Sequence, residues 1–315
     1  MVSLVTSKMN EMLTERPNLD VWSNISNLER PLLMMSEMVW RSPSCFLNAY
    51  PVITFSPLFW NDLSQLINDN KPKDFYYGLV LTLTNVIALI SSSEDPNPEV
   101  KASDVNLLFN YIHSTPSLFE EETWTTMCIP GISEEFLLHV YCKFENESLG
   151  IVFISTSDED AAFNSFSDCA TGLFNEIKST GLMNHISSWG TKCFEPINMQ
   201  EITCAIIRNN FNNQYVAYNL PSPSSYTNEE FNLLSRFEDM YSWSLAHTKK
   251  HMYIIEWDEG ETYVMYWKTG NSSSYTFLLW IDEWISNGKD IEDICKTLLE
   301  ELKSPKKSTF INKFS

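Results

Sequence analysis

The sequence predicts an α+β protein in which one structural module occurs twice. After residue 60 the order of hairpin, helix, three strands and helix is found two times, each over roughly 120 residues. Short turns join the strands, so neighbouring strands run antiparallel and a doubly wound parallel sheet is excluded. The chain has 315 residues and 43% apolar content, which is enough for two cores of ordinary domain size.

Composition and charge divide the chain into three predicted parts. These are a helical lead-in at 1–50, a first module at 51–190 and a second module at 191–315. The formal net charge is −20, and most of it falls in the first module. The two modules therefore differ in charge although their predicted elements follow the same order.

The lead-in has the apolar spacing of helices. Apolar residues recur at helical intervals from Val2 to Leu13, and a second helical run extends from Leu32 to Trp40. Prolines follow both runs and end them. Pro51 and Pro57 then favour an extended connection into the first module.

The first module begins with a hairpin that turns at Thr84-Asn85. Its later elements are a helix to about residue 113, capped by Ser103-Asp104, and strands at 124–129, 136–144 and 149–155. Its last helix begins at 157–160, where acidic residues suit the positive end of the helix dipole.

The second module repeats this order. The predicted elements are strands at 202–208 and 214–220, a helix opened by a capping box at 227–230, strands at 252–257, 263–268 and 275–280, and a helix at 290–302. The repeat indicates two sheets of the same design, each flanked by helices.

Composition also excludes several classes of function. A surface this acidic repels phosphate backbones, so we expect no nucleic acid as a partner. The nine glycines are dispersed, which disfavours a P-loop or a dinucleotide-binding fingerprint. The longest apolar stretch, 79–90, is shorter than the roughly 20 residues of a membrane-spanning helix. The seven cysteines are odd in number and form no CxxC motif. This favours free thiols in the cytoplasm over disulfides or a zinc site.

No arrangement of residues predicts a catalytic, cofactor-binding or metal-binding site. His247 and His251 have helical metal spacing, but two lysines lie between them in place of a carboxylate. Cys128 lies at a strand end. It could be the nucleophile of a hydrolase only if His139 or His185 lies within hydrogen-bond reach of its thiol. The acidic runs at 120–122, 134–135, 158–160 and 300–301 are typical of solvated faces. We therefore expect a protein that is not an enzyme in the covalent sense.

Two further groups of residues have alternative interpretations. The tryptophans of the second module belong either to its core or to a protein interface. They are Trp257, Trp267, Trp280 and Trp284. The basic tail with Lys303, Lys306, Lys307 and Lys313 is either a solvated end or a contact with an anionic membrane surface.

Several short motifs together resemble the vacuolar fusion protein MON (SAND) family. The most specific is Cys128-Ile129-Pro130-Gly131-Ile132, followed by the strand from Phe136 to Tyr141. The other matching motifs occur in the family's order: Arg16–Asp20, Pro43–Leu47, Asp104–Asn110 and Tyr226–Glu230. The match covers nearly the whole chain, thinly in its last third.

The resemblance implies tandem longin modules, each a five-stranded antiparallel sheet with helices on both faces. Members of the family pair with a CCZ-type subunit as a heterodimer. The pair is a guanine nucleotide exchange factor for a Rab-family GTPase, and it acts in endosome maturation, vacuole fusion and autophagy. The resemblance thus implies a cytoplasmic scaffold subunit, peripheral on late endosomes and vacuoles, without a cofactor.

The sequence departs from the family at two places. The sequence begins in the helix that follows the family's first longin module. We therefore expect either an N-terminally incomplete gene product or a lineage that retains only the two later, scaffold modules. That module contributes the GTPase contact in the family, so the resemblance assigns no catalytic residue here, and the partner-binding residues stay unknown. Val21–Ile25 also replace an arginine- and leucine-rich stretch. The alternative function is a longin-type trafficking adaptor or tether without exchange activity.

Overall fold

The computed structural model describes the greater part of the chain from residue 42 onward. The described residues are 42–53, 57–70, 72, 75–91, 101–133, 137–145, 149–157, 160–184, 186, 202–220, 228–246, 252–257, 261–268, 275–281 and 288–302. The predicted lead-in helices at 2–13 and 32–40 lie outside them.

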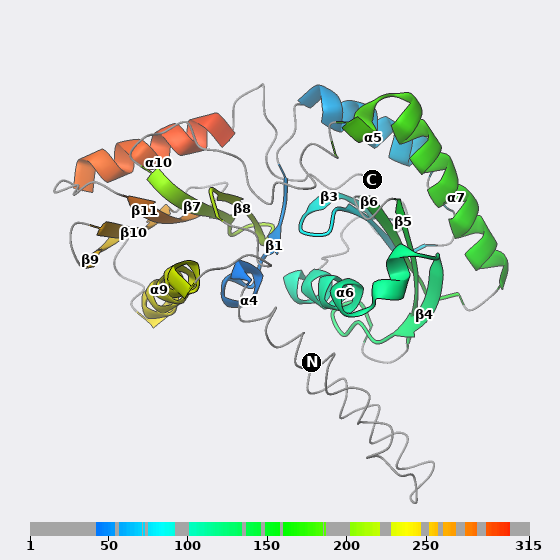
Figure 1. Ribbon diagram of the computed structural model, residues 1–315, viewed down its shortest axis with the longest axis horizontal. Coiled ribbons are helices and arrows are strands. Elements are labelled where there is room, and N and C mark those ends of the chain that lie inside the picture. Colours follow the sequence, from blue (N-terminus) through cyan, green and yellow to red (C-terminus); the bar gives the residue numbers. More distant parts are fainter. Residues whose placement is uncertain are drawn as a thin grey trace, which may run out of the picture.

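The first sheet has five antiparallel strands in the spatial order β3-β2-β6-β5-β4. In chain order they are β2 (Tyr77–Leu81), β3 (Val86–Ser91), β4 (Thr123–Met127), β5 (Leu138–Glu145) and β6 (Leu149–Ser155). Helix α6 (Ala102–Ser114) covers one face, and α5 (Pro57–Asn70) and α7 (Asp160–Ser179) cover the other (Figure 1). A short 3-10 helix, η1 (Pro116–Phe119), leads from α6 to β4.

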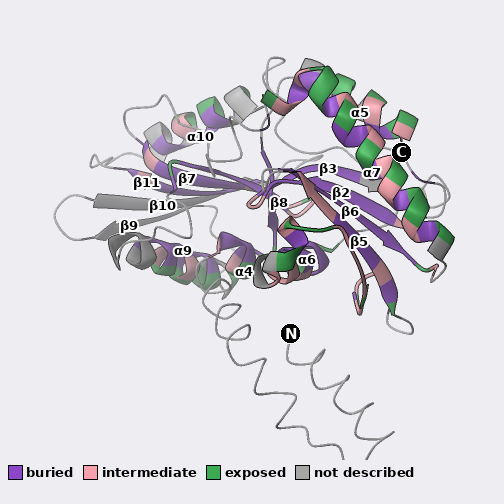
Figure 2. Ribbon diagram, turned by 45° about the vertical axis from the view of Figure 1, so that its right-hand side comes forward, coloured by how far each residue is buried: buried purple, intermediate pink, exposed green. Residues whose placement is uncertain are grey.

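The second sheet contains β7 (Ile202–Asn209), β8 (Gln214–Tyr218), β9 (Met252–Trp257), β10 (Glu261–Lys268) and β11 (Tyr275–Ile281). Their spatial order is β8-β7-β11-β10-β9. Helix α9 (Asn228–Ala246) lies on one face and α10 (Gly288–Leu302) on the other (Figure 2).

The two sheets are built on one plan, as the sequence predicts. In each sheet the first and second strands form a hairpin, the fifth strand pairs with the first, and the third strand lies at an edge. Each sheet has helices on both faces, with α6 and α9 on one side and α7 and α10 on the other (Figure 2). The α+β class with antiparallel sheets flanked by helices is therefore confirmed.

A short strand, β1 (Tyr50–Pro51), lies between the two sheets and follows helix α4 (Pro43–Leu47). It pairs in parallel with β8, with Tyr50 opposite Gln214. Val52 makes a parallel bridge to Val86 of β3. One segment thus links the edges of both sheets, and a run of buried side chains continues from one sheet into the other.

Alternating side chains along β7 separate two layers of core. Ala205 and Ile207 belong to the large core that both sheets share, whereas Cys204 and Ile206 pack beneath α9 and α4. This alternation follows from the two-residue period of a strand. Each face of the second sheet is therefore buried by its own set of apolar residues.

Three local expectations need correction. Pro57 begins helix α5, where we expected an extended connection; proline suits a first helical position because its missing N–H would have no helical partner there. The N-cap of α6 is Lys101, in place of Ser103-Asp104, and the Asp104 carboxylate accepts a hydrogen bond from Gly131. The second sheet has six strands, where five were expected, because β1 pairs with β8; the module boundaries stay predictions.

No helix in the described part of the chain is both long and apolar enough to cross a membrane.

Candidate functional site

Hydrogen-bonded polar side chains lie where the two sheets meet. We call residues 42–53, which include α4 and β1, the junction segment. It contacts the second sheet, helix α9 and helix α6.

Helix α4 begins and ends sharply. The Ser42 hydroxyl accepts a hydrogen bond from the backbone N–H of Ser44 at 3.3 Å, and Pro43 occupies the first helical position. Asn48 ends the helix with φ 46°, a left-handed conformation that asparagine tolerates better than most residues. This turn directs the chain from α4 into β1.

The junction segment is bound to β8 by backbone and side-chain hydrogen bonds. The N–H of Tyr50 donates to the Asn213 carbonyl at 3.0 Å, and the N–H of Val52 donates to the Tyr215 carbonyl at 2.9 Å. The Gln214 amide donates to the Tyr50 hydroxyl at 2.8 Å. Burial raises the pKa of Tyr50 to about 12, although this hydrogen bond opposes the shift. Tyr50 is therefore a neutral hydroxyl at neutral pH.

Helix α4 also packs on α9. The rings of Phe46 and Tyr241 lie 6.2 Å apart. The Arg208 guanidinium lies over the Tyr241 ring at 5.9 Å, donates to the Tyr241 hydroxyl, and donates to the Asn213 side-chain oxygen at 2.8 Å. Burial lowers the pKa of Arg208. A partly buried cation thus ties α9 to the β7–β8 turn.

Two polar residues of α6 connect the junction segment to the first module. The Asn106 amide donates to the carbonyls of Ser44 and Ala49, each at 3.4 Å. Two residues earlier, the Asp104 carboxylate accepts a hydrogen bond from the backbone N–H of Gly131 at 3.2 Å. Asp104 is only 3% exposed, and burial raises its pKa. Helix α6 therefore holds both the junction segment and the turn after β4.

This arrangement brings separate sequence motifs into contact. The motifs at 43–47, 104–110 and 128–132 are joined through Asn106 and Asp104. The motif at 226–230 leads into α9, which packs on α4. These contacts are partly buried hydrogen bonds and apolar packing, which fix the positions of elements and supply no nucleophile. The site is suited to hold two modules together as one scaffold.

The predicted candidates for chemistry do not come together among the described residues. His247, His251 and His185 lie outside them. Cys128 is half-buried, and no hydrogen bond joins it to His139, whose ring stacks on Trp124 at 5.4 Å. Within the described part of the chain, no group of three histidines, cysteines or acids could hold a metal.

The acidic runs have different outcomes. Glu120 and Glu121 are exposed, as expected of a solvated face. Glu122 is bound by the Tyr141 hydroxyl at 2.7 Å and the Ser167 hydroxyl at 2.8 Å. Burial by itself would raise the pKa of Glu122. The two hydroxyls and the Lys143 ammonium together have the larger effect, so the pKa lies below its ordinary value. The runs at 134–135 and 158–159 lie outside the described residues.

The tryptophan and lysine groups are described only in part. Trp280 packs against the buried residues beneath α9, which agrees with a core role. The side chains of Trp257 and Trp267, the whole of Trp284 and the basic tail lie outside what the structure describes.

The sequence singled out Asn106 only as part of the motif at 104–110 and did not single out Gln214, although both residues hold the junction segment. Asn106 and Gln214 are polar, yet each lies next to apolar residues in its helix or strand, and that position was the available signal. A polar residue at a buried position needs a hydrogen-bond partner. Identifying that partner required the path of the chain between the two sheets, which periodicity does not provide.

Comparisons with known proteins agree with this fold. Residues 73–175 match the second longin domain of FUZ, MON1 and HPS1. The chain is 23% identical over 183 residues to vacuolar fusion protein MON1 homolog A of Macaca fascicularis, which covers 57% of this chain and 32% of the relative. It is 21% identical over 248 residues to Protein SAND of Takifugu rubripes, covering 76% and 46%.

A fungal relative matches a shorter stretch. Vacuolar fusion protein MON1 of Cryptococcus neoformans is 29% identical over 96 residues, covering 30% of this chain and 15% of the relative. The chain spans about a third of the length of the animal MON1 relatives that it matches. The comparisons confirm the resemblance inferred from the sequence: residues 73–175, which hold the first sheet, match a longin domain, and the chain is similar to the MON1 and SAND vacuolar fusion proteins.

Proposed function

We propose that this chain is a scaffold subunit of a MON/CCZ-type guanine nucleotide exchange factor complex for a Rab-family GTPase of late endosomes and vacuoles. In this role it pairs with a CCZ-type longin subunit at the cytoplasmic face of those membranes. The process served is endosome maturation, vacuole fusion and late autophagy.

The contact between resembling motifs at the junction segment supports this proposal most. The resemblance alone is thin at each motif, but three motifs far apart in sequence meet through Asn106 and Asp104. Asn106 holds the junction segment, which pairs with β8 of the second sheet, against the first module, and Asp104 holds the turn at 128–132 on the same helix. A scaffold needs this rigidity, because an exchange factor acts by differential binding to states of its GTPase and not by covalent chemistry.

Co-expression with a CCZ-type subunit, followed by a nucleotide-release assay, tests the proposal. We expect the full chain to co-purify with that subunit, and the complex to accelerate nucleotide release from a late-endosomal Rab-family GTPase. The control is the CCZ-type subunit alone.

The outcomes separate the alternatives. A complex that binds the GTPase without accelerating release favours a trafficking adaptor or tether. Recovery of the chain as a monomer with no longin-containing partner contradicts the scaffold proposal.

A further inference from the structure

Strand β4 forms an edge of the first sheet that no described strand covers. It pairs with β5 from Thr123 opposite Cys142 to Met127 opposite Leu138, and it is last in the strand order (Figure 1). Among the described residues its backbone makes no other hydrogen bond. An edge strand presents a row of unpaired N–H and C=O groups, which is a template for another strand.

The sequence of β4 contains none of the devices that usually protect such an edge. The strand reads Thr-Trp-Thr-Thr-Met, without lysine, glutamate or proline. Threonine and tryptophan favour strands. By contrast, the opposite edge of the same sheet, β3, is bridged by Val52 of the junction segment. Of the two edges of this sheet, β4 is the one open to a partner among the described residues.

The edge is also held rigidly. The Trp124 ring stacks on His139 at 5.4 Å and packs on Phe166 of α7 at 5.6 Å. In the turn after β4, the N–H groups of Ile132 and Ser133 both donate to the Ile129 carbonyl at 3.0 Å. A preorganised edge loses little conformational entropy when a partner strand binds.

The start of β4 is strongly acidic. Glu120 and Glu121 precede it and are exposed, and Glu122 reaches α7 beside Asp168, which is also exposed. One described cation, Lys143, pairs with Glu122 at 3.4 Å. The carboxylates here outnumber the cations, so a partner segment with basic residues complements this end.

The other end of β4 is apolar. Met127 lies opposite Leu138, and the adjoining Leu137 is 40% exposed. Pro130, in the turn that follows β4, is exposed as well. A partner strand therefore meets acidic groups at one end of the edge and apolar groups at the other.

We propose that β4 accepts an extended strand from a partner protein, by β-strand addition, with lysine or arginine residues near Glu120–Glu122 and an apolar side chain near Leu137. A second copy of this chain fits less well, because each copy has a net charge of −20 and two copies repel. The inference rests on the proposed function for the existence of a partner subunit, and adds the surface that the partner binds.

The test compares two substitutions in the full chain. Thr126 is exposed on β4, and Thr126→Lys places a charge on the edge that repels a basic strand. Thr297→Lys makes the same change at an exposed threonine of α10, and so controls for the added charge. We expect Thr126→Lys to weaken binding to the co-purified CCZ-type subunit at least about tenfold, and Thr297→Lys to leave it within about twofold.

A second variant tests the charge complementarity. Glu120→Lys combined with Glu121→Lys alters exposed residues only, so the fold is retained. We expect weaker binding and a smaller dependence of affinity on salt. Hydrogen exchange in the wild-type complex should show new protection at the amides of β4.

The outcomes distinguish this inference from the proposed function. If the wild-type complex forms but Thr126→Lys binds as tightly as Thr297→Lys, the β4 surface is wrong and the scaffold proposal stands. If no complex forms with wild type, both fail. If the chain alone sediments as a dimer that Thr126→Lys dissociates, the occupant is a second copy and the proposed partner strand is wrong.

Discussion

At the scale of single residues, the Asp104 carboxylate lies so close to Gly131 that it leaves no room for a side chain there. The Gly131 N–H donates to one carboxylate oxygen at 3.2 Å, and a Cβ at residue 131 would lie 1.9 Å from the other oxygen. A Cβ at this position would force the carboxylate to move. This contact holds the turn that follows β4, within the motif at 128–132.

Gly131→Ala should therefore destabilise the protein. Because the new methyl group must displace a buried, hydrogen-bonded carboxylate, we expect a loss of about 1–3 kcal/mol in the free energy of unfolding. Urea denaturation measures it. Asp104→Ala removes the clashing group, so the double variant should lose less than the sum of the single variants. Additive losses would show that the carboxylate is not the obstacle.

Asp104 also gives the protein a defined pH dependence. Burial raises the pKa of its carboxyl above the ordinary 3.8, so the native state binds this proton more tightly than the unfolded chain does. Its contribution to stability is full below pH 3.8 and falls as pH rises through the raised pKa. Asp104→Asn removes this titration and keeps an oxygen that can accept from Gly131.

We expect the variant Asp104→Asn to gain stability relative to wild type as pH rises across that window. Free energies of unfolding from urea titrations at several pH values measure the difference. A difference that is constant with pH, or that favours wild type as pH rises, contradicts the burial of an ionisable carboxyl.

At the scale of elements, α4 is short but it buries Leu47 completely and Phe46 in part. Leu47 has no exposed surface and packs with Phe237 and Met240 of α9. Cys45 of the same helix is exposed. Variants of Leu47 and Cys45 therefore compare a buried and an exposed position of α4.

Leu47→Ala should cost about 2–5 kcal/mol, because it leaves a cavity between α4 and α9. Cys45→Ala should change stability by no more than about 0.5 kcal/mol. Thermal or urea unfolding of both variants checks the comparison. Equal, small effects would mean that α4 does not pack on α9.

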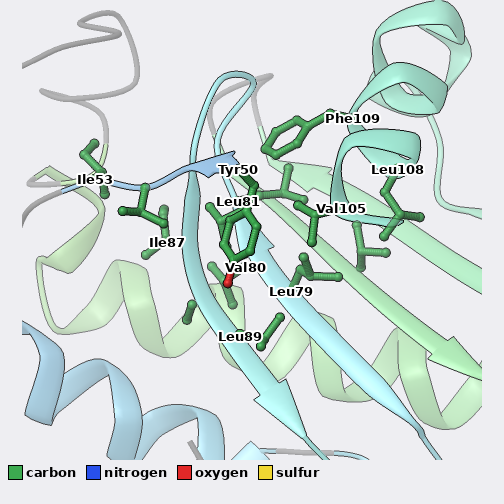
Figure 3. Packing of buried hydrophobic residues seen from close by; sticks show 14 of the residues in the cluster. Tyr50, Ile53, Leu79, Val80, Leu81, Ile87, Leu89, Val105, Leu108 and Phe109 are labelled. Carbon is green, nitrogen blue, oxygen red and sulfur yellow. The ribbon is translucent and has the colours of Figure 1, made fainter. Parts of the chain in front are cut away.

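Most elements could be predicted from the sequence because their apolar periods are strong. Val105, Leu108, Phe109 and Ile112 were expected on one face of a helix, and all four are buried. Figure 3 shows Val105, Leu108 and Phe109 in the same cluster as Tyr50 and residues of β2 and β3. Helix α5 was missed because Pro57 favours either an extended connection or a helix start, and the sequence does not decide between them.

The candidate site was less accessible to sequence reasoning. The motifs at 43–47 and 128–132 were singled out, but their contact through α6 depends on the tertiary path of the chain. The short strand β1 contains Pro51 and has two residues, so it has no periodicity to detect. Long elements are specified locally, whereas a junction between modules depends on contacts between residues far apart in sequence.

At the scale of the whole molecule, the two sheets share one core. Buried residues of β2, β3, β7 and β11 belong to a single cluster, and the junction segment lies among them. A shared core couples the stability of both sheets, because loss of one exposes apolar surface of the other.

Equilibrium unfolding should therefore show one cooperative transition for both sheets. Urea unfolding followed by circular dichroism and by tryptophan fluorescence checks this, since Trp124 lies in the first sheet and Trp280 in the second. Coincident curves are expected. Two separated transitions would indicate modules that fold independently.

The most direct measurement is hydrogen exchange in the variant Tyr50→Ala. Tyr50 is buried in the shared core, pairs with β8 and lies two residues before the bridge to β3. If the junction segment joins the two sheets, the amides of both β3 and β8 should exchange faster in the variant than in wild type. Faster exchange confined to β8, with β3 unchanged, would contradict the claim that these residues join two modules into one scaffold.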